Sequence, residues 1–246
     1  MHWQDQGVVL AARRHGESSA VISVFTPTRG RHAGWVRGGA GRRARSLYQP
    51  GNRLRLTWRA RLADQLGSFS AELDAAIAAR LLDEPDRLAG LGAACALLEA
   101  TLPERDPHPI LYNVFSELID TLAEREDWLE RYIGFELNLL AELGFGLDLA
   151  SCAVTGATTD LVYVSPRSGR AVSRAGAGAY ADRLLPLPGF LLGEGSADRA
   201  QIGAGLRLSG AFLRRHLFDA SERPMPSARE RLVRRFTRAT AGSPRA

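Results

Sequence analysis

Hydrophobic and polar residues alternate along the first quarter of the chain with the two-residue period of a β-strand. The clearest stretch is 53–62, where apolar side chains occupy the even positions and arginine or threonine the odd ones. Successive side chains of a strand point to opposite faces, so this stretch predicts a strand with one buried face and one exposed, arginine-rich face. Earlier strands are predicted at 8–10, 21–25 and around Trp35 and Val36.

A Gly-rich segment at 38–45 lies between the third and fourth of these strands and carries three arginines. It predicts a mobile connection. Because no lysine follows the glycines, a flexible hairpin connection is a better explanation than a phosphate-binding loop. Several short, half-buried strands at this spacing are typical of a small Greek-key barrel such as the OB-fold.

Past Ala71 the apolar period becomes that of helices. Apolar stripes predict helices over 91–102, 111–122 and 127–144, the last with Asp127 as its N-cap. Helical patterns return at 202–217 and again from Ser227, where Glu230 completes a capping-box spacing.

The predicted fold class is α+β, with two domains. An N-terminal OB-fold barrel occupies 1–75, and an α-helical bundle domain occupies 76–246. The stretch 150–188, rich in Gly, Ser, Thr and Val, predicts a small β-rich insertion within the helical domain.

Charge divides the chain into three segments. Residues 1–61 contain twelve arginines and two acids, residues 62–160 five arginines and nineteen acids, and the remainder fifteen arginines and six acids. All 32 basic residues are arginine, which suits bidentate contacts to phosphate. Without lysine the chain can be neither a P-loop nucleotidase nor a Schiff-base enzyme.

The basic N-terminal segment predicts a nucleic-acid-binding surface. Exposed positions of a strand are often charged, so an ordinary solvated face is the alternative, but the shortage of acids before Asp64 favours nucleic acid. The candidate phosphate contacts are Arg29, Arg31, Arg37, Arg42, Arg43, Arg45, Arg53, Arg55, Arg59 and Arg61, and the candidate base-stacking residues are Trp35 and Tyr48. The last helix offers a second contact or a plain soluble face, with Arg229, Arg231, Arg234, Arg235 and Arg238.

Other chemistry is poorly supported. Cys95 and Cys152 are expected to be buried free thiols, and the five histidines lack metal-ligand spacing. Carboxylates of the middle segment fall on helix surfaces, so catalytic pairing is not expected. The sequence has no membrane-spanning run or signal peptide, which predicts a soluble, cytoplasmic protein.

The order of short motifs resembles the bacterial RecO family of recombination mediators. In the N-terminal part these motifs are Trp3-Gln4, Val8-Val9-Leu10, Glu17-x-Ser19, Val24-Phe25-Thr26, Gly30-Arg31, Arg37-Gly38 and Gln49-Pro50. The central motif runs from Phe135 to Gly144 and is followed by Leu147 and Cys152. The closing one comprises Arg223-Pro224, Ser227 and Arg229-Glu230.

The resemblance implies a nucleoid-associated, non-enzymatic DNA-repair protein without a cofactor. Such a protein binds single- and double-stranded DNA, anneals complementary strands, and helps to load a recombinase onto DNA coated by single-strand-binding protein (SSB), together with the partner RecR. The acidic C-terminal tail of SSB is a further implied partner, for which the candidate contacts are Arg125, Arg131, Arg207, Arg214 and Arg215. An OB-fold RNA-binding adaptor and, more remotely, a metal-free hydrolase remain alternatives.

Many members of that family carry a four-cysteine zinc module. At the corresponding positions this chain has Cys152, Thr155, Ser173 and Gly176, so one ligand of four is present. A structural zinc ion is therefore not expected.

Overall fold

The computed structural model describes residues 1–62 and 64–237. The chain divides into two compact units, Met1–Arg125 and Glu126–Ala246. Within the described residues no helix is long and apolar enough to cross a membrane.

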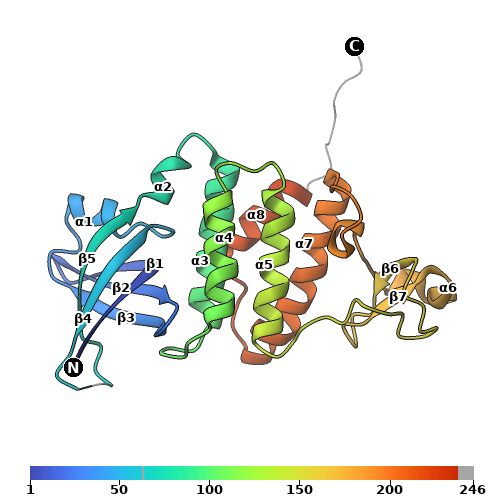
Figure 1. Cartoon of the computed structure of the whole chain (residues 1–246), viewed down its shortest axis with the longest axis horizontal. Helices are drawn as coiled ribbons and strands as arrows, with labels where there is room; N and C mark the ends of the chain where they lie inside the picture. The colour runs from blue at the N-terminus through green and yellow to red at the C-terminus, as the bar shows by residue number, and fades with distance from the viewer. Residues whose placement is uncertain (63, 238–246) are drawn as a thin grey trace, which may run out of the picture. The chain divides into compact units, whose positions relative to one another are not determined.

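A closed five-stranded barrel forms the first part of unit one (Figure 1). Its strands run in the spatial order β1-β2-β3-β5-β4, and β3 meets β5 in parallel while the other neighbours are antiparallel. This arrangement is that of an OB-fold, as the sequence predicts. The strands are β1 (His2–His15), β2 (Ser19–Thr26), β3 (Gly30–Val36), β4 (Arg53–Arg59) and β5 (Ser68–Ala75).

Strand β1 is longer than the apolar run at 8–10 that predicts it, because it serves two neighbours. Its first half, from His2 to Val8, pairs with β4, and its second half, from Val8 to His15, pairs with β2. The register shifts between Val9 and Ala11, where a bulge turns the strand from one partner to the other. One strand thereby closes the barrel.

The alternation predicted for β4 is present. Leu54, Leu56 and Trp58 are buried in the barrel core, and Arg55 and Arg59 are exposed. The strand ends at Arg59, however, and Leu62 is 54% exposed, so the predicted extension to residue 62 is wrong.

Strand β5 occupies a stretch for which helical periodicity is predicted from residue 71 onward. Only Phe69 of its eight residues is buried, and Glu72 and Asp74 are exposed. Apolar residues at 69, 71, 73 and 75 do alternate with polar ones along the strand, a two-residue period that the prediction of helix missed, and the strand pairs with both β4 and β3.

The predicted mobile connection at 38–45 is partly a helix, α1 (Arg42–Leu47). Tyr48 follows this helix and is 5% exposed in the barrel core, so its predicted role as a base-stacking residue is wrong. The Asn52 side chain donates hydrogen bonds to the carbonyls of Ser46 and Leu47 and holds the end of α1.

Three helices complete unit one: α2 (Ile77–Arg80), α3 (Pro85–Thr101) and α4 (Pro109–Thr121). Helix α3 packs against β1, and α4 packs against β2. Phe25 of β2 makes the second contact, with ring centroids 5.4 Å from Tyr112 and 6.4 Å from Phe115. Both cysteines, Cys95 of α3 and Cys152 of unit two, are buried free thiols.

Unit two is built on helices α5 (Trp128–Glu142), α7 (Arg199–Leu213) and α8 (Ser227–Thr237). Helix α7 packs against both α5 and α8. Asp127 stands at the N-cap of α5 but its side chain makes no capping hydrogen bond, whereas Asp198 and Gln201 form a capping box on α7 that the sequence analysis does not identify.

The β-rich excursion of unit two is a three-stranded sheet in the order β7-β6-β8. Its strands are β6 (Leu161–Val164), β7 (Ala171–Ser173) and β8 (Leu185–Pro186). The remaining short elements of unit two are α6 (Arg174–Ala177), η1 (Gly178–Arg183), η2 (Gly189–Leu192), the π-helical turn η3 (Arg214–Phe218) and η4 (Asp219–Ser221).

Candidate nucleic-acid interface

Seven of the ten predicted phosphate-binding arginines are exposed and have no acidic partner among the described residues: Arg29, Arg37, Arg42, Arg43, Arg45, Arg59 and Arg61. Four of them, between Arg37 and Arg45, lie on α1 and the segment that leads into it, which we call the α1 patch. The others lie around the start of β1, because Arg59 is opposite His2 in the β1–β4 ladder and Arg29 lies over the Trp3 ring.

The other three predicted contacts are engaged with acids of the same unit. Arg31 is half-buried, with its Nη1 3.7 Å from Glu99, and Arg55 Nη2 lies 3.6 Å from Glu72. Arg53 donates from Nη2 to both carboxylate oxygens of Asp120, at 3.0 and 3.1 Å. The arginine-rich face of β4 is therefore not a continuous phosphate-binding ladder.

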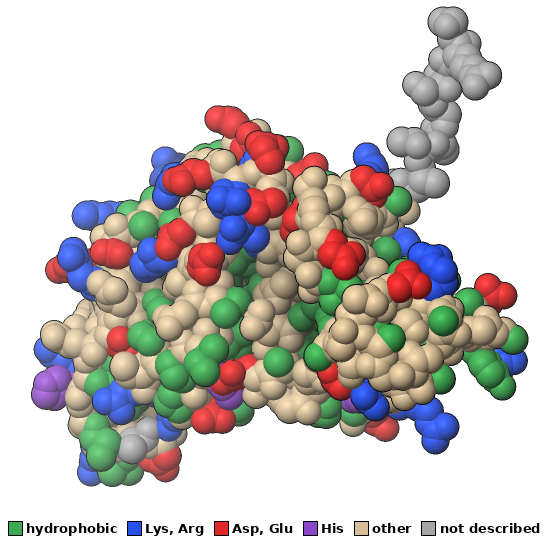
Figure 2. Space-filling model, turned by 45° about the vertical axis from the view of Figure 1, so that its right-hand side comes forward, with side chains coloured by type: hydrophobic (Ala, Val, Ile, Leu, Met, Phe, Trp, Pro, Cys, Tyr) green, Lys and Arg blue, Asp and Glu red, His purple; other side chains and the backbone are tan. Residues whose placement is uncertain are grey.

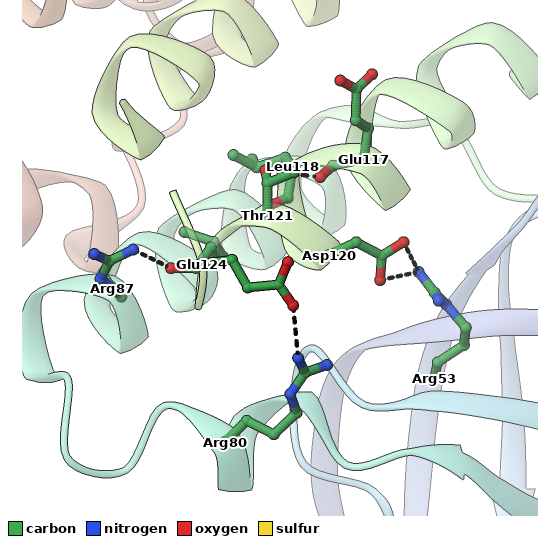
Figure 3. A network of polar contacts seen from close by, with 9 residues as sticks. Arg53, Arg80, Arg87, Glu117, Leu118, Asp120, Thr121 and Glu124 are labelled. Atoms are coloured by element: carbon green, nitrogen blue, oxygen red, sulfur yellow. Dashed lines mark hydrogen bonds and ion pairs between the residues drawn. The ribbon is translucent and has the colours of Figure 1, made fainter. Parts of the chain in front are cut away.

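Figure 3 shows how Arg53 is used instead. Arg53 of β4 and Arg80 of α2 reach the carboxylates of Asp120 and Glu124 at the end of α4. Arg87 of α3 donates to the carbonyl of Leu122, which lies just beyond the last turn of α4. These cations sit near the negative end of the α4 dipole, so they stabilise its attachment within unit one.

The acidic partners of Arg31, Arg53 and Arg55 explain why the charge count of residues 1–61 overstates the number of available arginines. Glu72, Glu99 and Asp120 all lie beyond the first 61 residues, and the fold returns them to the barrel. On the face drawn in Figure 2, arginine and acidic side chains are intermingled. The basic character of the barrel thus resides in its unpaired arginines rather than in the whole segment.

The structure also changes which aromatic residues are candidates for base stacking. Trp35 of β3 is half-buried and stays a candidate for base stacking, while Tyr48 is in the core. Trp3, which is not among the predicted base-stacking residues, is half-buried beside Arg29. The sequence does not indicate that Trp3 is partly exposed. It is the second residue of β1 and lies directly opposite the buried Trp58.

The arginines of the last helix do not form one surface. Arg229 is 3% exposed and bonded to buried Glu136, so it is unavailable to DNA. Arg231, Arg234 and Arg235 are exposed on α8, and Arg238 lies outside the described residues.

The five candidate contacts for the acidic tail are spread over both units. Arg125 belongs to unit one, and its carbonyl accepts a hydrogen bond from Arg87. Arg131 of α5 is paired with Asp127, and Arg215 donates to the carbonyl of Pro166. Arg207 and Arg214 are exposed, seven residues apart along α7 and the turn that follows it.

The four positions corresponding to a zinc module meet in unit two. Cys152 Sγ accepts hydrogen bonds from the backbone amides of Val154, Thr155 and Ser173 and from Ser173 Oγ, at 3.2–3.4 Å. Thr155 Oγ1 lies 3.3 Å from Ser173 Oγ, and a Cβ added at Gly176 would lie 2.8 Å from the sulfur. Hydrogen bonds among Cys152, Thr155 and Ser173 thus occupy the point on which the four positions converge.

This donor set does not fit zinc, because a structural zinc ion takes four sulfur or nitrogen ligands and only one is present. Burial raises the pKa of the Cys152 thiol, but hydrogen bonds from Ser173 and Thr155 outweigh burial and lower it to about 6. The described residues contain no group of three or more histidine, cysteine or acidic side chains placed to hold a metal ion.

The fold and the unpaired arginines define an OB-barrel protein with an appended helical unit. Family models described as "Recombination protein O N terminal" and "Recombination protein O C terminal" match residues 1–75 and 82–223. The chain belongs to the RecO family of DNA-repair and recombination proteins.

Relatives named DNA repair protein RecO match over nearly the full chain. The one from Cereibacter sphaeroides (strain KD131 / KCTC 12085) is 51% identical over 240 residues, covering 97% of this chain and 100% of the relative. The one from Ruegeria sp. (strain TM1040) is 52% identical over 234 residues, covering 95% and 97%. The one from Rhodospirillum rubrum is 49% identical over 248 residues, covering 98% of each.

Proposed function

We propose that this chain is a non-enzymatic DNA-binding mediator of recombinational repair that binds single- and double-stranded DNA and anneals complementary strands. The observation that carries the proposal is the set of seven exposed barrel arginines without acidic partners among the described residues. Unpaired guanidinium groups on an OB barrel are suited to a phosphate backbone, because no internal ion pair must break before they bind.

Annealing follows from the same chemistry without ATP. Two complementary strands repel each other through their phosphates, and arginines that displace counterions from both strands reduce this repulsion. The α1 patch and the arginines at the start of β1 occupy different parts of the barrel, which favours contact with more than one stretch of backbone.

The test is the salt dependence of single-stranded DNA binding. For Arg42→Ala/Arg43→Ala we expect weaker binding to all sequences and a slope of log K against log salt reduced by about 1.4, since each phosphate contact contributes ~0.7. The matched control is Arg80→Ala/Arg174→Ala, which removes the same charge from two exposed arginines that already pair with Glu124 and Asp160. Equal slopes for the two double variants would remove the α1 patch from the proposal.

Two further assays separate this proposal from the RNA-binding adaptor and the hydrolase. An RNA-binding adaptor predicts that RNA competes better than DNA of the same sequence for the α1 patch. A hydrolase predicts shortened strands after incubation, which gel analysis of end-labelled DNA detects. We expect neither result, and we expect complementary strands coated with single-strand-binding protein to anneal without ATP.

We also propose RecR and the acidic tail of SSB as partners. Arg207 and Arg214 are the tail contacts that we favour, because both are exposed and neither has an acidic partner among the described residues. Arg131, in contrast, is already paired with Asp127 at 3.2 Å.

A further inference from the structure

We propose that a pocket beside Trp3, at the start of β1, takes one unstacked base of a bound single strand, with its phosphate on Arg29 and Arg105. The pocket has a volume of about 470 Å³. This inference rests on the proposed DNA-binding function and assigns that function a base-binding site separate from the α1 patch.

Aromatic rings form one wall of the pocket. Trp3 stacks on Trp58 with ring centroids 5.7 Å apart and planes inclined by 17°. Trp58 is buried and its indole N–H donates to the carbonyl of Leu66 at 3.0 Å, so the inner ring is fixed. Trp3, held on this fixed ring and only half-buried, offers an ordered apolar surface on which a base can stack.

A buried imidazole without hydrogen bonds also lines the pocket. His32 is 4% exposed, and neither ring nitrogen has a hydrogen-bond partner. Its ring stands edge-on to Trp3 and Trp58, at 5.1 and 5.0 Å between centroids. Burial, then Arg105, lowers the pKa of His32 to about 4, so the imidazole is neutral at physiological pH and offers a base a polar, uncharged neighbour.

Two arginines supply the positive charge. The Arg29 guanidinium lies 5.9 Å from the centroid of the Trp3 ring and is exposed. A base that stacks on Trp3 takes the place of this guanidinium, which is then released toward the phosphate attached to the base.

Arg105 also lines the pocket and is held on a strained backbone. Its φ of 65° lies in the left-handed region that a residue with a side chain rarely adopts. The Arg105 amide donates to the Arg31 carbonyl and its Nη2 to the Gln65 carbonyl, both at 2.7 Å, while Nε lies 3.7 Å from Glu104. Such strain persists where the surroundings enforce it, which is characteristic of binding sites.

The lining of this pocket contains no carboxylate, which distinguishes it from a second, larger hollow on the barrel. The nine lining residues here include Arg29 and Arg105 but no Asp or Glu. The second hollow, of about 610 Å³, is lined by Asp5 and Glu72 and has Arg55 as its only cation. An anionic nucleotide therefore fits the Trp3 pocket and not the second hollow.

The experiment compares oligo(dT) with a strand of the same length whose residues are abasic. For Trp3→Leu we expect binding to oligo(dT) to weaken by about fivefold or more, the scale of one base–aromatic stack, and binding to the abasic strand to stay at the wild-type value. Trp35→Leu makes the same substitution at the other half-buried tryptophan of the barrel. A base-dependent loss at Trp35→Leu without one at Trp3→Leu would overturn the pocket and leave the proposed function standing.

A measurement on the unmodified protein guards against a folding defect, since Trp3 also packs on Trp58. Oligonucleotides carrying 5-iododeoxyuridine are irradiated in complex with the full chain, and the crosslinked peptide is identified by mass spectrometry. We expect the crosslink at Trp3 or at its pocket neighbours. Crosslinks confined to Trp35 or to the α1 patch would overturn the pocket, and the absence of any complex with single-stranded DNA would overturn the proposed function with it.

Discussion

The Arg229 guanidinium and the Glu136 carboxylate form a doubly hydrogen-bonded ion pair in the core of unit two. Arg229 Nε donates to Oε1 at 2.7 Å, and Nη2 donates to Oε2 at 2.8 Å. Arg229 is 3% exposed and Glu136 fully buried, and Ser209 of α7 donates to the same carboxylate. Arg229 Nη2 also donates to the Leu206 carbonyl, so one pair joins α5, α7 and α8.

Removal of one partner should destabilise unit two strongly. For Arg229→Ala we expect the free energy of unfolding to fall by about 3–5 kcal/mol, because the Glu136 charge is left buried without compensation. Chemical denaturation, followed by the far-ultraviolet circular dichroism of the helices, measures the change. The control is Arg231→Ala, an exposed arginine on the same helix, for which we expect a change within about 0.5 kcal/mol.

The double variant Arg229→Met/Glu136→Leu separates pairing from packing. If the large cost of the single variant comes from an unpaired charge, replacement of both charges by apolar side chains should recover much of the lost stability. A double variant as unstable as Arg229→Ala would show instead that hydrogen bonds to Ser209 and Leu206 dominate.

The barrel should lose stability in mild acid through His32. Its pKa is about 4 in the folded protein and about 6.5 in an unfolded chain, so between these values the unfolded state binds more protons. The stability that His32 contributes is therefore complete above about pH 6.5 and is lost as the pH falls toward 4, by on the order of 2–3 kcal/mol.

The variant His32→Leu tests this assignment. Neither ring nitrogen makes a hydrogen bond, so an apolar side chain of similar size removes the titration without breaking a bond. We expect the unfolding free energy of unit one to be nearly flat between pH 7 and 5 in this variant and to decline in the wild type. Parallel pH profiles would assign the decline to groups other than His32.

The zinc module should be recoverable by substitution. Because the residue pairs 152/155 and 173/176 converge on one point, Thr155→Cys/Ser173→Cys/Gly176→Cys places four sulfurs within reach of a metal that binds them at about 2.3 Å. We expect one zinc ion per triple variant, and none in the wild-type protein, by elemental analysis without chelators. The control is Cys152→Ala in the triple variant, which removes one of the four sulfurs and should weaken the site. Stoichiometric zinc in the wild-type protein would contradict the prediction made from its donor set.

The fold was predictable where burial is periodic. Residues 53–59 alternate strictly, and the helices from residue 85 to 142 carry continuous apolar stripes. Strand β5 was missed although its apolar and polar residues alternate, because Phe69 is its only fully buried residue, and α1 was missed because none of its six residues is fully buried. Pairing with β3 and β4 fixes β5, and packing of Ala44 and Leu47 on the barrel core fixes α1; a local pattern records neither.

The candidate site was predictable as a charge pattern but not as a set of available arginines. Asp120 lies 67 residues beyond Arg53 and Glu136 lies 93 residues before Arg229, so the acids that neutralise these two arginines are invisible to local counting. The Trp3 pocket joins residues of β1, β3, β4 and the α3–α4 loop, which lie far apart in the sequence and meet only in the folded unit.

The acidic tail of SSB provides the last prediction. Arg207→Glu/Arg214→Glu should weaken binding of a tail peptide by about fivefold or more, because two unpaired guanidinium groups become repulsive, while binding of naked single-stranded DNA to the barrel stays near the wild-type value. Arg131→Glu is the matched control: its guanidinium already pairs with Asp127, so its reversal should disturb a local ion pair and affect the peptide less. Fluorescence anisotropy of labelled peptide and labelled DNA measures both affinities. If the double reversal leaves peptide binding intact while Arg42→Ala/Arg43→Ala abolishes it, the tail competes with DNA for the α1 patch, and the two ligands do not have separate sites.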